Sequence, residues 1–233
     1  MVGCPRLNLT LVRALGLSAL LAQGMPSLAA ERCSEPNADG VRSCEVSLEH
    51  ASIAQMAVPQ EQALWCWAAS IAMIYAHYGY RITQGEIVAI RAPMAHEQSA
   101  GASGETITQL LSRAWVTRDN TTFESSAVAA DRNANRFELT NEAALEELAQ
   151  GRPLLVGANG HAMVLVALHF QRTAQGRVRI DGGTVIDPEP GTGVRRLTAS
   201  EMTPTYIAAV RVRRADRRGA ADLAAPIQVG MLP

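Results

Sequence analysis

The sequence predicts an α+β protein, with an N-terminal half built from helices and a C-terminal half built from antiparallel strands. Between residues 66 and 148, several segments place apolar side chains at helical spacing. From residue 154 onward, short runs rich in Val, Ile and Leu are separated by turn sequences that contain Gly and Asp. Helices followed by a series of strands are typical of an α+β fold with segregated halves.

The composition is that of one globular domain. The chain has 233 residues, of which 48% are hydrophobic and 18% charged, which favours a buried core over disorder. The formal net charge of -1 gives no electrostatic reason to expect a nucleic-acid partner. A late basic run lacks interleaved aromatic residues, and we interpret it as a strand edge and a solvated tail: Arg211, Arg213, Arg214, Arg217 and Arg218.

Residues 1–30 resemble an export signal. Arg6 and Arg13 supply a positive start, residues 14–22 form an apolar stretch too short to span a bilayer, and small residues surround a cleavage point after Ala29 or Ala30. The alternative is an N-terminal helix that stays as an anchor. The signal predicts a secreted or periplasmic protein without stable membrane association after cleavage.

The four cysteines divide into three roles. Cys4 falls in the signal, and Cys33 and Cys44 enclose a short polar, turn-rich segment. In an exported protein such a pair is typical of a disulfide, here within an N-terminal extension over residues 31–51. Cys66 is left unpaired. We expect no metal and no cofactor, because the cysteines lack zinc-site spacing and no phosphate-binding or dinucleotide motif follows a strand.

Four helices are expected in the first half. The first runs over residues 66–77 and ends at Gly79, and the next two span residues 83–92 and 104–114. Thr140 caps a fourth helix that contains residues 144–148 and stops at Gly151. The polar or small-residue segments 94–104 and 118–135 are expected to be loops.

The second half is expected to contain short strands with Gly-rich turns. Gly176 and the sequence Asp181-Gly182-Gly183 supply turn chemistry between neighbouring runs. The runs with strand character cover residues 154–157, 163–170, 178–180, 184–186 and 206–212.

Cys66 is the candidate nucleophile. A thiol becomes reactive as its thiolate, and the free N–H groups and dipole of a helix N-terminus stabilise that anion. Cys66 begins the first predicted helix, flanked by Trp65 and Trp67. A buried structural cysteine is the alternative. Upstream, the side-chain amide of Gln60 or Gln62 could join the Cys66 backbone N–H in stabilising an oxyanion.

His161 is the candidate base. It follows Asn159-Gly160 and opens an apolar strand, so its ring can project into a cleft. His77 lies eleven residues beyond Cys66 on the same predicted helix, roughly 16 Å away and out of hydrogen-bond range. The remaining histidines fit less well: His50 precedes the motif, His96 lies in a polar loop, and His169 lies near the far end of the same strand.

Asp187 is the candidate acceptor that orients the imidazole. It ends the apolar run 184–186 and precedes Pro188, and a strand paired beside that of His161 would bring its carboxylate to the ring. Asp181 is the alternative within a predicted remote turn. The alternative interpretation of Asp187 is a turn-forming Asp-Pro without a catalytic role.

Together, Gln60, Cys66-Trp67-Ala68-Ala69-Ser70, Gly160-His161-Ala162 and Val185-Ile186-Asp187-Pro188 resemble the papain-like cysteine protease superfamily. The sequence is similar to its compact bacterial members, such as bacteriocin-leader peptidases and secreted papain-like effectors. The resemblance covers roughly residues 53–212. It departs from the larger relatives at Trp65, where they have a disulfide-forming cysteine nearby, and at Asp187, where they often have asparagine.

The resemblance implies a helical half that carries Cys66, a β half that carries His161 and Asp187, and a cleft between them. It also implies that Gln60 is the oxyanion residue. The corresponding peptidase domain covers residues 52–213, followed by a tail over residues 214–233.

We therefore expect a secreted, monomeric peptidase with a protein or peptide substrate. The same Cys-His-Asp set would also serve deamidation, transglutamination or other amide hydrolysis, because all proceed through an acyl-enzyme. A catalytically inactive binding module on this scaffold is the third possibility.

Overall fold

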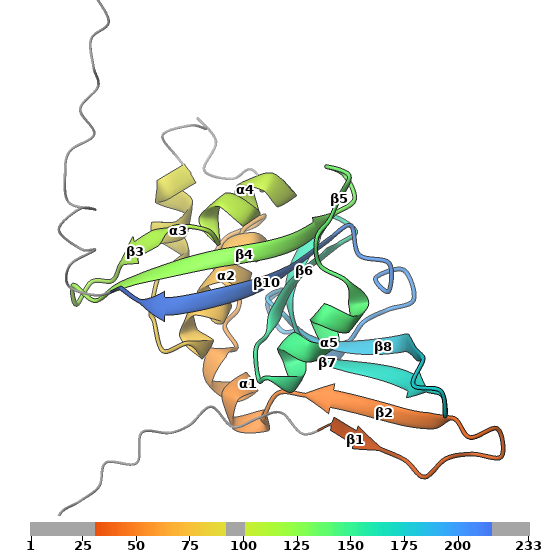
Figure 1. Ribbon diagram of the computed structural model, residues 1–233. Helices are drawn as coiled ribbons and strands as arrows, with labels where there is room; N and C mark the ends of the chain where they lie inside the picture. The colour runs from red at the N-terminus through yellow and green to blue at the C-terminus, as the bar shows by residue number, and fades with distance from the viewer. Residues whose placement is uncertain (1–30, 92–100, 216–233) are drawn as a thin grey trace, which may run out of the picture.

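The computed structural model describes residues 31–91 and 101–215 (Figure 1). It confirms the α+β class: helices α1 to α4 precede most of a large antiparallel sheet. The predicted signal, most of the predicted tail, His96, Arg217 and Arg218 lie outside the described residues. The helices are α1 (His50–Met56), α2 (Cys66–His77), α3 (Gln84–Arg91), α4 (Gly104–Leu110) and α5 (Asn141–Ala149).

The strands pair in the order β1-β2-β7-β6-β10-β4-β3, with β8 on β7, β9 on β8 and β5 on β4, and every pairing is antiparallel. The strands are β1 (Glu31–Cys33), β2 (Arg42–Ser47), β3 (Ala114–Val116), β4 (Thr122–Asp131), β5 (Arg136–Phe137), β6 (Leu154–Ala158), β7 (His161–Arg172), β8 (Val178–Asp187), β9 (Gly193–Arg196) and β10 (Tyr206–Arg214).

Strand β7 is the common partner of three others. Its first residues pair with β6, its last residues pair with β2, and its other edge pairs with β8. Residues 162–168 of β7 are all buried, as expected for a strand covered on both faces. The strand that opens with His161 is therefore held rigidly on both sides.

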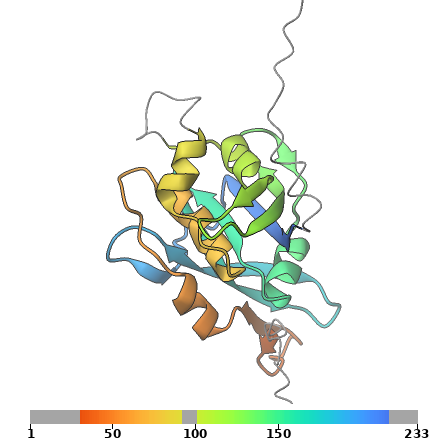
Figure 2. The ribbon, with the colours of Figure 1, turned by 90° about the vertical axis from the view of Figure 1, so that its left-hand side faces the viewer.

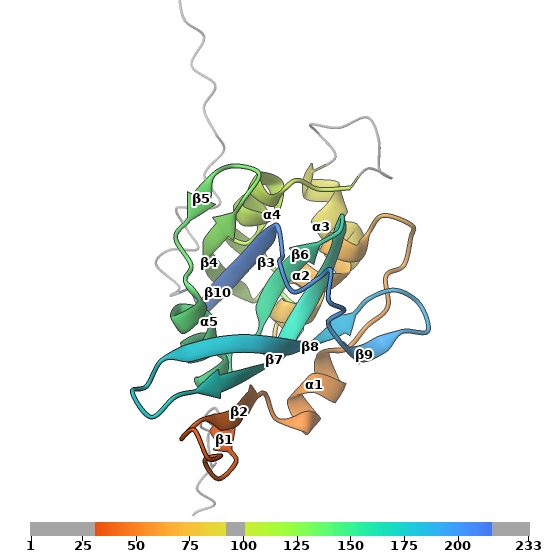
Figure 3. The same ribbon diagram turned by 90° about the vertical axis from the view of Figure 1, so that its right-hand side faces the viewer.

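Helix α2 is the buried centre of the fold. Its residues from Trp67 to Tyr75 are all buried, and the helix packs against β7 and β6 (Figures 2 and 3). A helix that is apolar on every side belongs in a core, which is what its sequence predicted. It ends before Gly79, whose φ of 83° lies in the region that favours glycine. Cys66 thus lies at the start of a buried, closely packed helix.

The fourth predicted helix is also present. In α5, the Thr140 side chain accepts a hydrogen bond from the Ala143 backbone N–H, the predicted cap. The second predicted helix corresponds to α3, which begins one residue later than expected at Gln84.

Two segments differ from their predictions. The helix expected over residues 104–114 ends at Leu110, because Ala114 starts the edge strand β3. The loop expected over residues 118–135 contains β4, which pairs with β10 on one side and with β3 and β5 on the other. Strand β4 is rich in alanine and serine, which have little intrinsic strand preference, so its conformation comes from its neighbours.

The predicted turn at Asp181-Gly182-Gly183 is also wrong, because these residues lie within the continuous strand β8. The register shifts there: His169 lies opposite Gly182 and Phe170 lies opposite Ile180, which leaves Asp181 as the extra residue of a bulge. A Cβ on Gly183 would come within 2.8 Å of Leu197 and 3.0 Å of Leu165. These glycines permit close packing rather than a reversal of the chain.

The N-terminal residues 31–51 join the main sheet. Cys33 and Cys44 lie opposite each other in the β1–β2 hairpin and form the predicted disulfide, with an S–S distance of 2.03 Å. Strand β2 then pairs with β7, and Cys44 and Val46 are buried. Within the described residues, no helix combines the length and apolar character needed to cross a bilayer.

Candidate active site

Cys66 is the first residue of α2 and is half-buried. The first N–H groups of a helix have no partner within the helix, so they are available to stabilise an anion at this position. The chain reaches Cys66 through Leu64, a non-glycine residue with a φ of 65°. Left-handed backbone at such a residue is uncommon and clusters at functional sites. The turn thus places the thiol at the tip of a buried helix.

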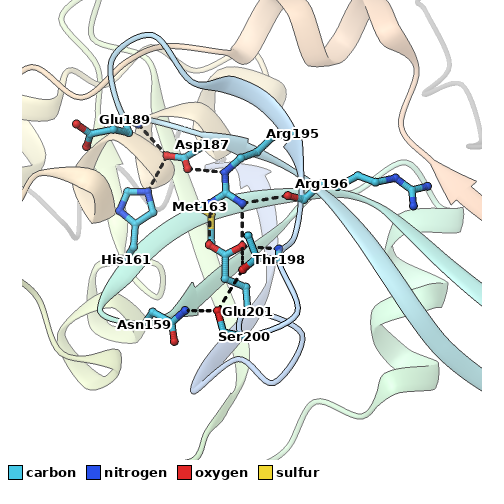
Figure 4. Close-up of polar contacts among 10 residues, drawn as sticks. All are labelled: Asn159, His161, Met163, Asp187, Glu189, Arg195, Arg196, Thr198, Ser200 and Glu201. Atoms are coloured by element: carbon cyan, nitrogen blue, oxygen red, sulfur yellow. Dashed lines mark hydrogen bonds and ion pairs between the residues drawn. The ribbon is translucent and has the colours of Figure 1, made fainter.

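His161 is the first residue of β7 and follows a tight turn. Asn159 and Gly160 both have positive φ, 53° and 76°, and Ala158 pairs directly with His161 across the β6–β7 hairpin. Asn-Gly is the sequence that such two-residue turns favour. The Asn159 side-chain amide donates to the Ser200 hydroxyl at 3.1 Å (Figure 4). The turn is therefore fixed from outside the hairpin as well.

Asp187 is the last residue of β8, the strand paired beside β7. Its Oδ1 lies 2.7 Å from Nε2 of His161 and also accepts the Glu189 backbone N–H at 2.9 Å. Its Oδ2 accepts from Nε of Arg195 at 2.8 Å (Figure 4). Because Nε2 of His161 faces Asp187, the other ring nitrogen remains for the Cys66 thiol, with which His161 is hydrogen-bonded.

Cys66, His161 and Asp187 form a row of interacting side chains, and the electrostatics of this row favour a thiolate–imidazolium pair. Burial acts to raise the pKa of the Cys66 thiol, but the hydrogen bond and charge of His161 and the backbone N–H groups of Ala162 and Trp67 outweigh it, so the pKa is lowered. The hydrogen bond to Cys66 is also the main reason that the pKa of His161 is raised to about 9; burial opposes this rise, and Asp187 adds to it.

The Asp187 carboxylate is charged in this setting. Burial acts to raise its pKa, but hydrogen bonds from the Glu189 backbone, His161 and Arg195 together lower it. A charged acceptor at Nε2 holds the imidazole in one orientation and stabilises its protonated form.

The two glutamines differ in placement. The Gln60 backbone N–H donates to the carbonyl of Pro188 at 2.7 Å. This bond connects the segment that precedes α2 to the turn that follows Asp187. The buried Oε1 of Gln60 has no hydrogen-bond partner among the described residues. Gln62 is exposed, and its carbonyl accepts the Trp65 N–H. Gln60 does not line the cavity beside Cys66, so its oxyanion role stays a prediction.

The other candidates are engaged elsewhere. His77 Nδ1 contacts the Ser52 hydroxyl at 2.9 Å, and His169 lies 3.1 Å from a Glu45 carboxylate oxygen. His50 is exposed at the start of α1, and Asp181 is exposed at the bulge in β8. None of these four makes a contact with Cys66 or His161 that the structure records.

A cavity of about 370 Å³ opens beside Cys66 and His161. Apart from His161, the charged residues that line it are Glu105 and Asp131. Oδ1 of Asp131 accepts the N–H groups of Asn133 and Ala134, at 3.0 and 3.2 Å. Gly104 packs against this carboxylate so closely that a Cβ there would lie 2.1 Å from Oδ2. One wall of the cleft therefore depends on a glycine.

Sequence reasoning missed Leu64 and Arg195. A left-handed leucine has no local signature, and Arg195 reaches Asp187 only through the pairing of β8 with β9. The described residues also contain one cluster of potential metal ligands, Glu31 with Cys33 and Cys44, but the two sulfurs are bonded to each other.

The chain is similar to a known protein family and to solved structures. A model of the family described as papain-like cysteine protease AvrRpt2 matches residues 49–201. Among solved structures, the chain is similar to UfSP from C. elegans, with 14% sequence identity and a TM-score of 0.41. That similarity covers 84% of this chain and 36% of the UfSP chain. No curated protein matches the sequence.

Proposed function

The chain belongs to the family described as papain-like cysteine protease AvrRpt2, and we propose that it hydrolyses peptide bonds through an acyl-enzyme on Cys66. As a cysteine-type peptidase of this family it acts on a protein or peptide. The observation that carries the assignment of roles is the hydrogen-bonded row of Cys66, His161 and Asp187, with its 2.7 Å contact between His161 and Asp187.

In the first step, the Cys66 thiolate attacks the carbonyl carbon of the scissile bond, and the carbonyl oxygen becomes an oxyanion. The His161 imidazolium then gives its proton to the leaving amine as the C–N bond breaks, which leaves a thioester on Cys66. In the second step, neutral His161 takes a proton from water as the water oxygen attacks the thioester carbon. The C–S bond then breaks, which releases the carboxylic acid and restores the Cys66 thiolate and the His161 imidazolium. Asp187 holds the ring in place throughout.

The oxyanion is assigned to two donors, the backbone N–H of Cys66 and the side-chain amide of Gln60. The position of Cys66 at a helix start supports the first, since its N–H is not needed within α2. The backbone bond from Gln60 to Pro188 supports the second, because it holds Gln60 beside the corner that carries Asp187.

We further propose export through residues 1–30, a secreted or periplasmic location, a monomer without stable membrane association, and no nucleic-acid partner. The disulfide between Cys33 and Cys44 supports an oxidising compartment. The proposed peptidase domain covers residues 52–213, after the extension 31–51 and before the tail 214–233.

The test is cleavage of unfolded protein by the wild-type chain and by Cys66→Ala and Cys66→Ser, with new N-termini mapped by mass spectrometry. We expect site-specific cleavage and stoichiometric labelling of Cys66 by iodoacetamide in the wild type, and neither in Cys66→Ala. Proteolysis that persists in Cys66→Ala would overturn the proposal. Ammonia release without new N-termini would reassign the same thioester chemistry to deamidation or transglutamination.

A further inference from the structure

Arg195 lies between two buried carboxylates. It comes from β9, and its guanidinium donates through Nε to Oδ2 of Asp187 at 2.8 Å. Its other two nitrogens, Nη1 and Nη2, donate to Oε2 and Oε1 of Glu201 at 2.8 and 2.7 Å (Figure 4). Asp187 and Glu201 are side chains with 6% and 9% exposure. A single cation therefore serves both.

Two further contacts help to hold the guanidinium. Nη1 also donates to the Arg196 carbonyl at 3.0 Å, and Nη2 lies 3.1 Å from the sulfur of Met163. Glu201 is fixed in turn by the backbone N–H of Thr198 at 2.7 Å and its hydroxyl at 2.9 Å. A planar fork bound to a carboxylate through two parallel hydrogen bonds has a defined orientation that an ammonium group cannot reproduce.

The charges along this line alternate in sign. The charged groups that face Asp187 are His161 from β7 and Arg195 from β9, and Cys66 from α2 lies beyond His161. The groups that face Arg195 are Asp187 and Glu201. Without Arg195, two buried carboxylates would share one site, and a like charge at short range drives one of them to bind a proton.

We propose that Arg195 is a positioning residue of the active site: anchored by Glu201, it keeps Asp187 ionised and turns its Oδ1 toward His161. The inference rests on the proposed roles of Cys66, His161 and Asp187. It extends the row of interacting groups by two residues that do not touch the reacting atoms. A protonated Asp187 would present a hydroxyl where the imidazole Nε2–H needs an acceptor.

The direct test follows the carboxyl groups themselves. In the full chain with ¹³C-labelled aspartate and glutamate, the carboxyl signal of Asp187 is titrated by NMR in the wild type, Arg195→Met and the double variant Arg195→Met/Glu201→Gln. We expect the Asp187 midpoint to move to higher pH by about one unit or more in Arg195→Met. The double variant should move it back toward the wild-type value, because the competing carboxylate is gone.

Arg196→Met is the matched control. Arg196 is the neighbouring residue on β9, but its side chain points away from Asp187 and contacts His169 at 3.3 Å (Figure 4). Its substitution should leave the Asp187 titration unchanged. Arg195→Lys keeps a positive charge but lacks the planar guanidinium. Compared with Arg195→Met, it should bring the Asp187 midpoint back close to the wild-type value and recover turnover only in part.

The catalytic arm measures the pH dependence of cleavage of a fluorescently labelled unfolded protein, per Cys66 titrated with iodoacetamide. In the wild type, the acid limb of turnover is expected to follow the Cys66 thiol. In Arg195→Met, protonation of Asp187 should add a second loss of turnover on the acid side, which moves the limb to higher pH, and the double variant should reverse that movement. A merely structural Arg195 would reduce the fraction of titratable Cys66 and leave the limb in place. The proposal would be overturned if the Asp187 midpoint did not move in Arg195→Met. It would also be overturned if the midpoint or the acid limb of turnover lay farther from the wild-type value in the double variant than in Arg195→Met.

The two proposals fail in different ways. A wild-type chain that cleaves no protein would remove the peptidase function, while the NMR titration would still report whether Arg195 governs Asp187. Should Arg195→Met not fold, Arg195→Lys and the double variant carry the same comparison, because neither leaves the two carboxylates facing each other without a cation.

Discussion

At the scale of the residue, the proposed mechanism makes the pH range of activity depend on the Cys66 thiolate and the His161 imidazolium. The thiolate forms on the acid side, where the lowered pKa of Cys66 is crossed, and the imidazolium survives up to the raised pKa of His161, about 9. Because both charges are needed for the first step, activity should rise through the first value and fall through the second.

Replacing Asp187 with asparagine tests this reading. Asparagine keeps an acceptor for the imidazole but removes the negative charge that helps to raise the pKa of His161. The alkaline limb of the activity profile should therefore move to lower pH. The loss of rate should be smaller than the roughly 100- to 10,000-fold that removal of the acid–base group itself costs. The control is His169→Gln, because His169 lies on the same strand as His161 but far from Cys66, and it should leave both limbs in place. An alkaline limb that is unchanged in Asp187→Asn would contradict the role assigned to Asp187.

The two glutamines offer a second test with an internal control. Gln60→Ala should lower kcat by roughly 100- to 1000-fold if its amide stabilises the oxyanion, the cost of losing one such donor. Gln62 is exposed and two residues away, so Gln62→Ala should be close to wild type. Equal effects of the two substitutions, measured as turnover per titrated Cys66, would remove Gln60 from the site.

Single residues were predictable from sequence where the local pattern itself is distinctive. Cys66 begins an apolar helix, His161 follows an Asn-Gly turn, and Asp187 ends a strand before proline, and the structure brings all three together. Arg195 has no such pattern. Its partnership with Asp187 depends on strand register, which one sequence does not reveal.

At the scale of the element, α4 packs against β4 through a contact that only glycine allows. A Cβ on Gly104 would lie 2.1 Å from the Asp131 carboxylate and 2.7 Å from the Tyr206 ring, and Asp131 is anchored by two backbone N–H groups. Gly104→Ala should therefore destabilise the fold by about 1–3 kcal/mol, typical of overpacking, and reduce turnover by displacing the cleft wall.

Gly85 in α3 provides the comparison. Nothing lies within 4 Å of the position its Cβ would occupy, so Gly85→Ala should be neutral or stabilise the protein by up to about 1 kcal/mol. Thermal unfolding of both variants gives the two values. A Gly104→Ala chain as stable and active as Gly85→Ala would show that α4 shifts freely.

Elements were predictable where periodicity is strong and failed where neighbours decide. Helix α2 is apolar throughout and was found with both of its ends, whereas β4 is held in place by β10, β3 and β5. In β8, an Asp-Gly-Gly sequence that favours turns lies inside a strand, because its glycines fit beneath neighbouring side chains. Local preference gave way to tertiary packing in both strands.

At the scale of the whole molecule, the sheet extends beyond the family match, which begins at residue 49. Strand β2 pairs with the second half of β7, and Val46 and Leu48 are buried. Burial of these two side chains is worth roughly 3–6 kcal/mol, a large share of the roughly 5–15 kcal/mol that holds a typical domain together.

A chain that begins at residue 49 should accordingly unfold at a markedly lower temperature than one that begins at residue 31. Its activity should be lost at that lower temperature as well. A chain that begins at residue 42 keeps β2 but lacks β1 and the disulfide, which separates the two contributions. The measurement is the unfolding midpoint by circular dichroism. Identical midpoints for the chains starting at 31 and 49 would show that β2 is dispensable.

The packing of α2 against β7 has a consequence for when the protein becomes active. Cys66 and His161 are far apart in the chain, and they meet only through the tertiary contacts between α2 and β7 in the folded molecule. Until then the thiol has an ordinary pKa of about 8.5 and is mostly protonated at neutral pH. Under the proposed mechanism the unfolded polypeptide is therefore inactive, and completion of the tertiary structure is the event that activates the proposed nucleophile.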